Sequence, residues 1–217
     1  MNKIVIAIDS FKGCLTSEEA GIAVMKGIKT IFPDCEILLF PIADGGEGML
    51  DVLISATQGK YRTLPAHGPL MELIQAQYGI SGDGQTALIE MAAISGLPLV
   101  PEEKRNPMLT TTYGTGELIL DALEQGCRRF IVGIGGSATN DAGLGMLQAL
   151  GFRFLDKRGN LLGTGGKIMS QVASIDTSAV HPALKETRFT IACDVHNPFC
   201  GSDGAAYIFA PQKGADA

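Results

Sequence analysis

The sequence has 217 residues, of which 46% are hydrophobic and 18% charged, and this balance excludes an intrinsically disordered chain. The formal net charge is −6 and tryptophan is absent, so the sequence lacks the basic surface and the aromatic stacking groups that nucleic-acid binding uses. We therefore expect no nucleic-acid partner.

The first 60 residues alternate between strand and helix patterns. Residues 3–8 (KIVIAI) form a β-branched run that predicts a strand buried on both faces. A helix follows, with Thr16 or Ser17 as its cap and two glutamates in its first turn. A second strand is predicted over 36–41, before an apolar helix over about 49–56. This order is typical of a parallel sheet with helices on its faces.

The pattern beyond residue 61 is less regular, and glycine-rich turns join shorter elements. The strands expected here are 75–80, 86–91, 129–134, 152–155 and 188–193. Helices are predicted over about 117–124 and from the 135–141 loop to Leu150. The change of pattern predicts a domain boundary, with residues 1–62 in one domain and residues 63–217 in the second.

Four glycine-rich loops adjoin predicted helices. They are residues 9–13, 44–48, 113–116 and 135–141. Such loops expose backbone N–H groups near a helix N-terminus, which favours anion binding. In an open α/β sheet, ligands bind outside the carboxyl ends of the strands. A tight turn explains any one of these loops equally well. Several in one chain indicate phosphate binding.

Aspartates occur at or just past the predicted strand ends, at positions 9, 44, 141 and 194. Mg²⁺ binds through one or two carboxylates plus substrate phosphates, so such residues suit a magnesium site. Taken singly, each aspartate is also explained by a turn or cap role. Lys12, in the loop between Ser10 and Gly13, can neutralise a transferring phosphoryl group.

A dinucleotide site is the main alternative at the 135–141 loop. Residues 133–138 fit the pattern GxGxxA after a predicted strand, and Asp156 ends the next strand about 20 residues on. Against this interpretation, Asn140 and Asp141 stand where a helix would meet a pyrophosphate. An NAD(P)-dependent oxidoreductase therefore stays open as an alternative function.

The five cysteines include no CxxC pair, which is typical of reduced thiols in the cytosol. Cys193, His196 and Cys200 offer three soft ligands, whereas structural zinc usually takes four. We expect Cys193 to be a buried strand cysteine. The apolar run at residues 4–8 is too short for a signal peptide, and no run reaches the length of a membrane span. The sequence thus predicts a cytoplasmic protein with no membrane partner.

Six stretches between residues 4 and 215 form an ordered set of motifs. They read IAIDSFKG-CLTSEEA, PIADGGEGM, ALIEMAAISGL, RNPMLTTTYGTGELI, GIGGSATNDAGLGMLQALG and CDVHNPFCG-SDGAA-FAPQKGA. Together they resemble the bacterial glycerate kinase family of type 1, also called glycerate 2-kinase. The blocks GGSATNDAG and TTYGTGEL are the most specific. Cys14 and Met49 depart from the family's more usual serine and threonine.

The resemblance implies an activity and a fold. The activity is transfer of the ATP γ-phosphate to a hydroxyl of D-glycerate with Mg²⁺, and 2-phosphoglycerate is expected in preference to 3-phosphoglycerate. The implied fold is two α/β domains around a cleft. One of them is flavodoxin- or Rossmann-like, with a mainly parallel sheet that is incomplete in this chain.

Residue chemistry within the matched motifs gives the candidate site. Asp194, Asp44 and Lys12 are the candidate catalytic residues, with Asp44 and Asp194 also the candidate Mg²⁺ ligands. Ser10 is placed at the phosphoryl or substrate side, and Arg105 is a candidate clamp for the glycerate carboxylate. The candidate phosphate-binding residues are Thr115, Gly135, Gly136, Ser137 and Asn140.

Members of the resembled family are considerably longer than this chain, and their C-terminal part completes the first domain. We therefore expect the sheet of strands 3–8 and 36–41 to have an unpaired edge and an exposed apolar face. Such a chain is expected to be marginally soluble, to form a homo-oligomer or to be part of a longer polypeptide, and the last is favoured. A non-catalytic remnant stays open as an alternative function.

Overall fold

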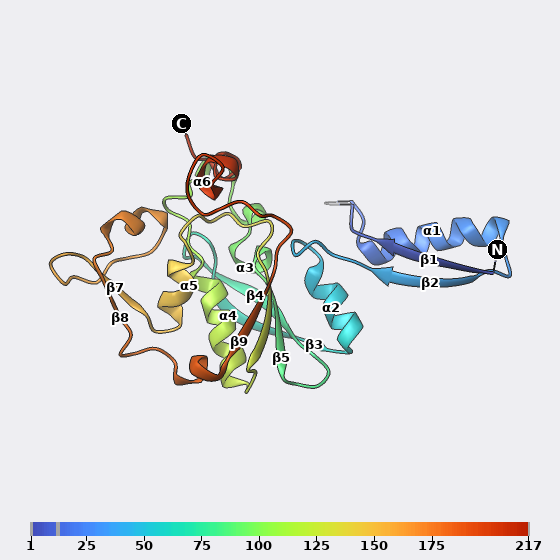
Figure 1. The fold of residues 1–217 in the computed structure, drawn as a ribbon, viewed down its shortest axis with the longest axis horizontal. Coiled ribbons are helices and arrows are strands. Elements are labelled where there is room, and N and C mark those ends of the chain that lie inside the picture. Colours follow the sequence, from blue (N-terminus) through green and yellow to red (C-terminus); the bar gives the residue numbers. More distant parts are fainter. Residues whose placement is uncertain (1, 12–13, 217) are drawn as a thin grey trace.

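The fold is described from a computed structural model, which covers residues 2–11 and 14–216. Helices and strands are mixed along the chain, and the strands form three sheets with two, five and two strands among the described residues (Figure 1). This arrangement confirms the α/β class. The division into residues 1–62 and 63–217 stays a prediction.

The N-terminal unit consists of β1 (Lys3–Ile8), α1 (Ser17–Ile31) and β2 (Glu36–Pro41), which lie at one end of the molecule (Figure 1). β1 and β2 pair in parallel, as their sequence order predicted. The cap of α1 is also confirmed: the Thr16 hydroxyl accepts the Glu19 N–H, and the Glu19 carboxylate accepts the Thr16 N–H. This reciprocal pair satisfies two N–H groups at the helix start.

The prediction that residues 3–8 are buried on both faces is wrong. Ile6 and its neighbour Leu39 lie toward α1, where Gly21 permits close approach to Leu39. Val5 and Phe40 alternate with them and are 58% and 52% exposed. α1 covers one face of this two-stranded sheet, and the other face presents apolar side chains to solvent. This agrees with the expectation that the sheet has an exposed apolar face.

The five-stranded sheet forms the body of the molecule. Its strands are β3 (Lys60–His67), β4 (Leu73–Ile80), β5 (Thr86–Glu90), β6 (Arg129–Gly133) and β9 (Arg188–Ala192). β3, β4 and β5 pair antiparallel, whereas β5, β6 and β9 pair in parallel. The sequence reading did not include β3. This edge strand is largely polar and contains Pro65, which an edge position tolerates.

Helices cover the two faces of this sheet. α2 (Met49–Thr57) packs Leu50 and Ile54 against Leu88 of β5. Ala87 and Ile89 point to the opposite face, because successive strand residues alternate. There they join the main core cluster with α4.

α4 (Tyr113–Glu124) is the central helix of the body, and it packs beside α5 (Leu144–Ala149) (Figure 1). The sequence predicted a loop over 113–116 and a helix start at 117, but these residues form the first turn of α4. Gly116 faces the backbone carbonyl of Met146, where a side chain would not fit. The glycine that suggested a loop therefore allows close helix packing.

The remaining elements are short. β7 (Arg153–Leu155) and β8 (Ser174–Asp176) form an antiparallel pair at the end of the molecule opposite β1 and β2 (Figure 1). The short helices and 3₁₀ turns are α3 (Ala92–Ser95), η1 (Leu97–Leu99), η2 (Glu102–Lys104), η3 (Gly166–Gln171), η4 (Pro182–Glu186), α6 (Ala205–Ile208) and η5 (Pro211–Lys213). No helix in the described ranges is both long and apolar enough to cross a membrane.

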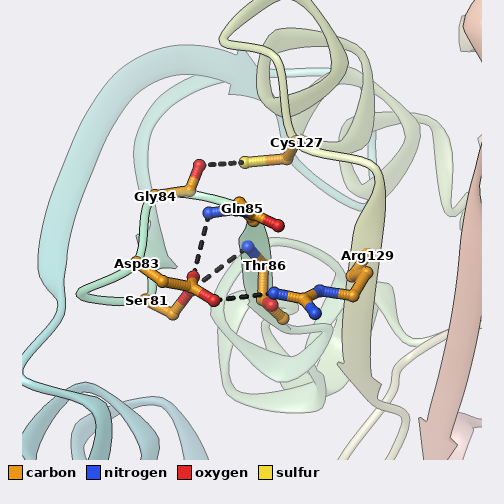
Figure 2. Close-up of polar contacts among 7 residues, drawn as sticks. All are labelled: Ser81, Asp83, Gly84, Gln85, Thr86, Cys127 and Arg129. Carbon is orange, nitrogen blue, oxygen red and sulfur yellow. Dashed lines mark hydrogen bonds and ion pairs between the residues drawn. The ribbon is translucent and has the colours of Figure 1, made fainter.

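A polar cluster ties the turn between β4 and β5 to the start of β6 (Figure 2). The Asp83 carboxylate accepts the Ser81 hydroxyl and the Gln85 N–H, and it pairs with Arg129 at 2.6 Å. These hydrogen bonds, the Ser81 hydroxyl first, lower the pKa of Asp83. The cluster holds the first residues of β5 and β6 next to each other. Because the two strands are paired in parallel over their whole length, their last residues also lie side by side.

Candidate active site

Three parallel strands end at one edge of the five-stranded sheet. Glu90 of β5 stands opposite Gly133 of β6, and Gly133 stands opposite Ala192 of β9. The chain segments that follow these residues therefore leave the sheet side by side. This is the edge at which open α/β sheets bind ligands.

The loop of Asp44 lies across this edge. The Gly45 carbonyl accepts the Gly135 N–H at 3.2 Å. Gly45 has a φ of 90°, and a side chain there would meet the Ala192 carbonyl. The Asp44 carboxylate accepts the Gly46 N–H at 2.8 Å and is exposed. Glycine at position 45 thus lets the loop rest on the ends of β6 and β9.

Asp194 follows Ala192 by two residues and is also exposed. The backbone contact between Gly45 and Ala192 therefore brings the two candidate carboxylates to the same edge. Two carboxylates with substrate phosphates are a donor set that Mg²⁺ accepts. Lys12, the third candidate catalytic residue, lies outside the described residues.

The cysteine-rich segment after β9 does not form a metal centre in the described residues, where no three His, Cys, Asp or Glu side chains gather closely enough. Cys193 and Cys200 are exposed free thiols. The expectation that Cys193 is a buried strand residue is wrong, because β9 ends one residue earlier, at Ala192.

A cavity of about 900 Å³ lies between the first turn of α1 and the start of α2. Ser10, Gly48, Tyr61 and Glu90 are among its lining residues. The Ser10 hydroxyl oxygen is buried and has no hydrogen-bond partner among the described residues. Ser10 is the candidate site residue that lines this cavity within the described part of the chain. Residues of the N-terminal unit and of the body thus line the same cavity.

Glu90 lines this cavity, and sequence reasoning did not single it out. It is only 7% exposed, and its Oε2 accepts the N–H groups of Gly48 at 3.1 Å and Leu50 at 3.0 Å. Burial raises the pKa of Glu90, and the charges of Asp51 and Glu47 add to the effect. A glutamate closing an otherwise apolar strand was the available signal, because a buried carboxylate is rare without a task.

The 135–140 loop is held from two sides. The carbonyl of Gly136, a residue with a φ of 69°, accepts the Leu97 N–H at 2.9 Å, and Ser137 forms a β-bridge with Gly96. On the other side, the Ser137 hydroxyl accepts a hydrogen bond from Lys213 at 2.9 Å. The loop is therefore a fixed structure on which a ligand can be oriented.

Asp141 joins the two most specific motifs of the sequence. Its carboxylate is buried and accepts the Thr112 N–H at 2.9 Å and the Gly145 N–H at 3.2 Å. It also accepts hydrogen bonds from Gly143 and from the hydroxyls of Thr111 and Thr112. Asp141 thus fastens the residues before α4 to the start of α5, a structural role in place of metal binding.

The segment of Arg105 and the loop of Asn140 are linked by glycines that pack against their backbone carbonyls. Gly214, with a φ of 89°, rests on the Arg105 carbonyl, and Gly166 rests on the carbonyls of Pro107 and Asn140. The Nε atom of Arg105 is buried with no hydrogen-bond partner in the described part of the chain. Arg105, Asn140 and the C-terminal turn therefore belong to one packed region.

The structure does not bring Thr115 to this edge. It is fully buried in α4, and its hydroxyl forms a 2.9 Å hydrogen bond with the Ser95 hydroxyl. Direct contact with a ligand stays a prediction, and the burial of Thr115 speaks against it.

Lys213 is the second residue that sequence reasoning missed, although it stands in the quoted motif FAPQKGA. It is 9% exposed, and its Nζ donates to Ser137 and, at 2.7 Å, to the Thr139 carbonyl. Burial lowers the pKa of Lys213 to about 8, against an opposing effect of the Asp141 charge. A lysine in a glycine-rich motif was the available signal, but its contact is 76 residues away in sequence.

The structural context of a dinucleotide site is absent from the 133–138 motif. The helix after it begins at Leu144 and not within the motif. The next strand, β7, pairs with β8 and not with β6. The Asp156 carboxylate accepts the N–H groups of Arg158 and Asn160 within its own turn. The oxidoreductase alternative is therefore not supported.

The decisive comparison is with protein families: the model of the glycerate kinase family matches residues 4–217. The chain belongs to the glycerate kinase family. This confirms the resemblance that the six motifs carried.

Individual relatives agree. The chain is 54% identical over 213 residues to glycerate 2-kinase from Escherichia coli K12, covering 98% of the chain and 56% of that protein. It is 53% identical over 215 residues to glycerate kinase from Bacillus subtilis 168, covering 99% and 56%. A crystal structure described as a candidate glycerate kinase 2 from Salmonella typhimurium LT2 matches with a TM-score of 0.88 and 48% identity, covering 99% of this chain and 57% of that one. The chain thus spans little more than half the length of the relatives it matches.

Proposed function

We propose that this glycerate kinase family chain carries binding and catalytic loops for transfer of the ATP γ-phosphate to a hydroxyl of D-glycerate. The observation that carries the proposal is the register of Glu90, Gly133 and Ala192, which gathers loops from separate family motifs at one sheet edge. The name of the Escherichia coli relative, glycerate 2-kinase, supports 2-phosphoglycerate as the product.

Phosphoryl transfer depends mainly on positioning and on neutralising charge. We assign these tasks first to Asp44 and Asp194, whose loops meet through Gly45 and Ala192. One accepts the proton of the attacking hydroxyl, and both are suited to hold Mg²⁺. Magnesium, when bound with ATP, supplies charge neutralisation at the phosphates. Lys12 is proposed to help neutralise the negative charge of the transferring phosphoryl group.

Substrate binding is assigned to the neighbouring groups. Gly135, Gly136, Ser137 and Asn140 form the fixed loop proposed to hold phosphates. The partnerless Ser10 hydroxyl and the Arg105 guanidinium are proposed to contact glycerate, since both have hydrogen-bond capacity unused by the described residues. Thr115 acts indirectly, by holding α4 against Ser95.

The test is an assay, with ATP, Mg²⁺ and D-glycerate, of a full-length, active version of this enzyme. We expect glycerate-dependent release of ADP, and ¹H–³¹P correlation NMR should place the new phosphate on the 2-hydroxyl. Asp194→Asn should lower turnover by about 10²-fold or more, the scale of a lost general base. Asp203→Asn, an exposed carboxylate in the same segment, is the matched control and should leave turnover unchanged. Turnover at the unsubstituted level in Asp194→Asn would remove Asp194 from the mechanism.

Ligand-dependent thermal unfolding separates the alternatives. ATP with Mg²⁺ should raise the melting temperature by mass action on the folded state, whereas NAD and NADP should not. Protection by ATP without any phosphorylated product would instead indicate a non-catalytic, nucleotide-binding chain. Association of the chain with itself stays a prediction.

A further inference from the structure

A lysine of the C-terminal turn is buried against the proposed phosphate loop. Lys213 ends η5, and its Nζ donates to the Ser137 hydroxyl at 2.9 Å and the Thr139 carbonyl at 2.7 Å. Both acceptors are uncharged. An ammonium group has three N–H donors, so one has no acceptor among the described residues. Burial of a cation without a directly paired anion is unfavourable, which points to a missing anionic partner.

The position of Lys213 is fixed by the residue after it. Gly214 has a φ of 89°, and a side chain there would meet the carbonyl and Cβ of Arg105. The turn is therefore packed between the Arg105 backbone and the 137–139 segment. The nearby carboxylate of Asp141 is already committed to Thr112, Gly143 and Gly145. The structure thus holds the ammonium at the loop, and among the described residues no carboxylate forms an ion pair with it.

The same loop has unused donors of its own. The backbone N–H groups of Gly136 and Ser137 donate to no acceptor within the described residues, although the Gly136 carbonyl and the Ser137 hydroxyl are both engaged. Gly136 is exposed and Ser137 partly so, which leaves them open to a ligand. A cation next to free N–H groups is the arrangement that binds phosphate oxygens.

We propose that Lys213 and the N–H groups of Gly136 and Ser137 form a subsite for a phosphate group. The inference rests on the proposed function in taking that phosphate from the polyphosphate of the nucleotide or from the phosphomonoester product. The third N–H of Lys213 donates to a phosphate oxygen, and its other two keep the loop in place.

Phosphate binding at this subsite should depend on pH, because it is coupled to protonation of Lys213. Burial holds the pKa of Lys213 at about 8, and a bound phosphate stabilises the ammonium form and raises this pKa. The charged group that acts on Lys213 is Asp141, before α5, and the segment after η2 packs against the same turn through the backbone of Arg105. Phosphate affinity should therefore fall as the pH rises from 7 to 9.5, because binding then requires uptake of a proton.

The experiment is calorimetric titration of the 217-residue chain with tripolyphosphate and with 2-phosphoglycerate, without Mg²⁺ and at constant ionic strength. At pH 7, Lys213→Met should weaken binding of at least one of them by about 10- to 100-fold, the effect of losing a charge-assisted hydrogen bond. The ligand that loses affinity identifies the source of the phosphate. Lys185→Met, an exposed lysine of η4, is the matched control and should bind as the unsubstituted chain does. Affinities within twofold of the unsubstituted chain for both ligands in Lys213→Met would overturn the subsite.

Two further measurements keep the test independent of folding and of catalysis. In the unsubstituted chain, the ligand that binds should slow hydrogen exchange at residues 136 and 137, and unchanged exchange would overturn the subsite. Lys213→Arg keeps its charge throughout and should lose less affinity between pH 7 and 9.5, whereas an equal loss overturns the linkage. Lys213-dependent binding without glycerate turnover would contradict the proposed function alone. Turnover together with Lys213-independent binding would contradict the subsite alone.

Discussion

The β1–α1–β2 unit and the five-stranded body both pack helices against a sheet, but they differ in how much apolar surface each buries. The body contains two core clusters, and Tyr78, Leu118 and Phe130 of the larger one are almost fully buried. The N-terminal unit leaves Val5 and Phe40 about half exposed on its uncovered face. Its order therefore depends more on local features such as the capping box of α1 than on a core of its own.

The candidate site occupies the junction between these two regions. Ser10 of the N-terminal unit and Glu90 of the body line the same cavity. A ligand that contacts both would tie the less stable region to the more stable one, because it binds only when the two are ordered together. Because the N-terminal unit buries less apolar surface than the body, we expect a bound ligand to increase the order of the N-terminal unit.

The largest expected effect comes from the core of the body. Leu118→Ala removes a fully buried side chain of α4 and should lower the free energy of unfolding by about 3 kcal/mol or more, through lost burial and a cavity. The matched substitution Ile31→Ala, at a 70% exposed position of α1, should change it by less than about 0.5 kcal/mol. Denaturant unfolding combined with hydrogen exchange at β5 and β6 measures both. Equal losses would contradict the difference in burial between the two regions.

Sequence patterns predicted the elements that carry their own local signal. The cap at Thr16 and the bounds of β2 are confirmed because hydrogen-bonding side chains and short apolar runs act within a few residues. β3 was missed because its burial alternates weakly, and the first turn of α4 was missed because its glycines serve helix contact and not a loop. In both cases tertiary packing overrides local propensity.

For the candidate site, the sequence predicted the loops but not the contacts between them. Placing glycine-rich loops at the carboxyl ends of parallel strands follows from topology, and the register of Glu90, Gly133 and Ala192 fits it. The hydrogen bond between Glu90 and Gly48 spans 42 residues, and that between Lys213 and Ser137 spans 76. No local pattern encodes such pairs, since they form only once the sheet and its loops have packed.

An intermediate effect is expected from the cap of α1. Thr16→Ala removes the hydroxyl that accepts the Glu19 N–H and should destabilise α1 by about 1 kcal/mol. Because the N-terminal unit has little core, the loss should appear as faster hydrogen exchange in α1 while β5 and β6 stay unchanged. Thr30→Ala is the control on the same helix, since its hydroxyl only bonds back to the Lys26 carbonyl and should matter little. Faster exchange in β5 after Thr16→Ala would mean that the two regions unfold together.

The smallest effect concerns Glu90, on the body's side of the cavity. Burial raises the pKa of Glu90 above its usual 4.5, so the folded chain binds a proton more tightly than the unfolded chain does. The free energy of unfolding should therefore fall as the pH rises from about 4.5 through the raised pKa, and the loss should stay constant above it.

Glu90→Gln isolates this contribution. Its amide oxygen can still accept the Gly48 and Leu50 N–H groups, but it carries no charge to desolvate. The variant should lack this part of the decline, so its stability relative to the unsubstituted chain should rise through the same pH window and then level off. Glu103→Gln, on the exposed turn η2, should run parallel to the unsubstituted chain. A parallel curve for Glu90→Gln as well would mean that the cavity hydrates Glu90 fully. The body's side of the junction would then be as open to solvent as the uncovered face of β1 and β2.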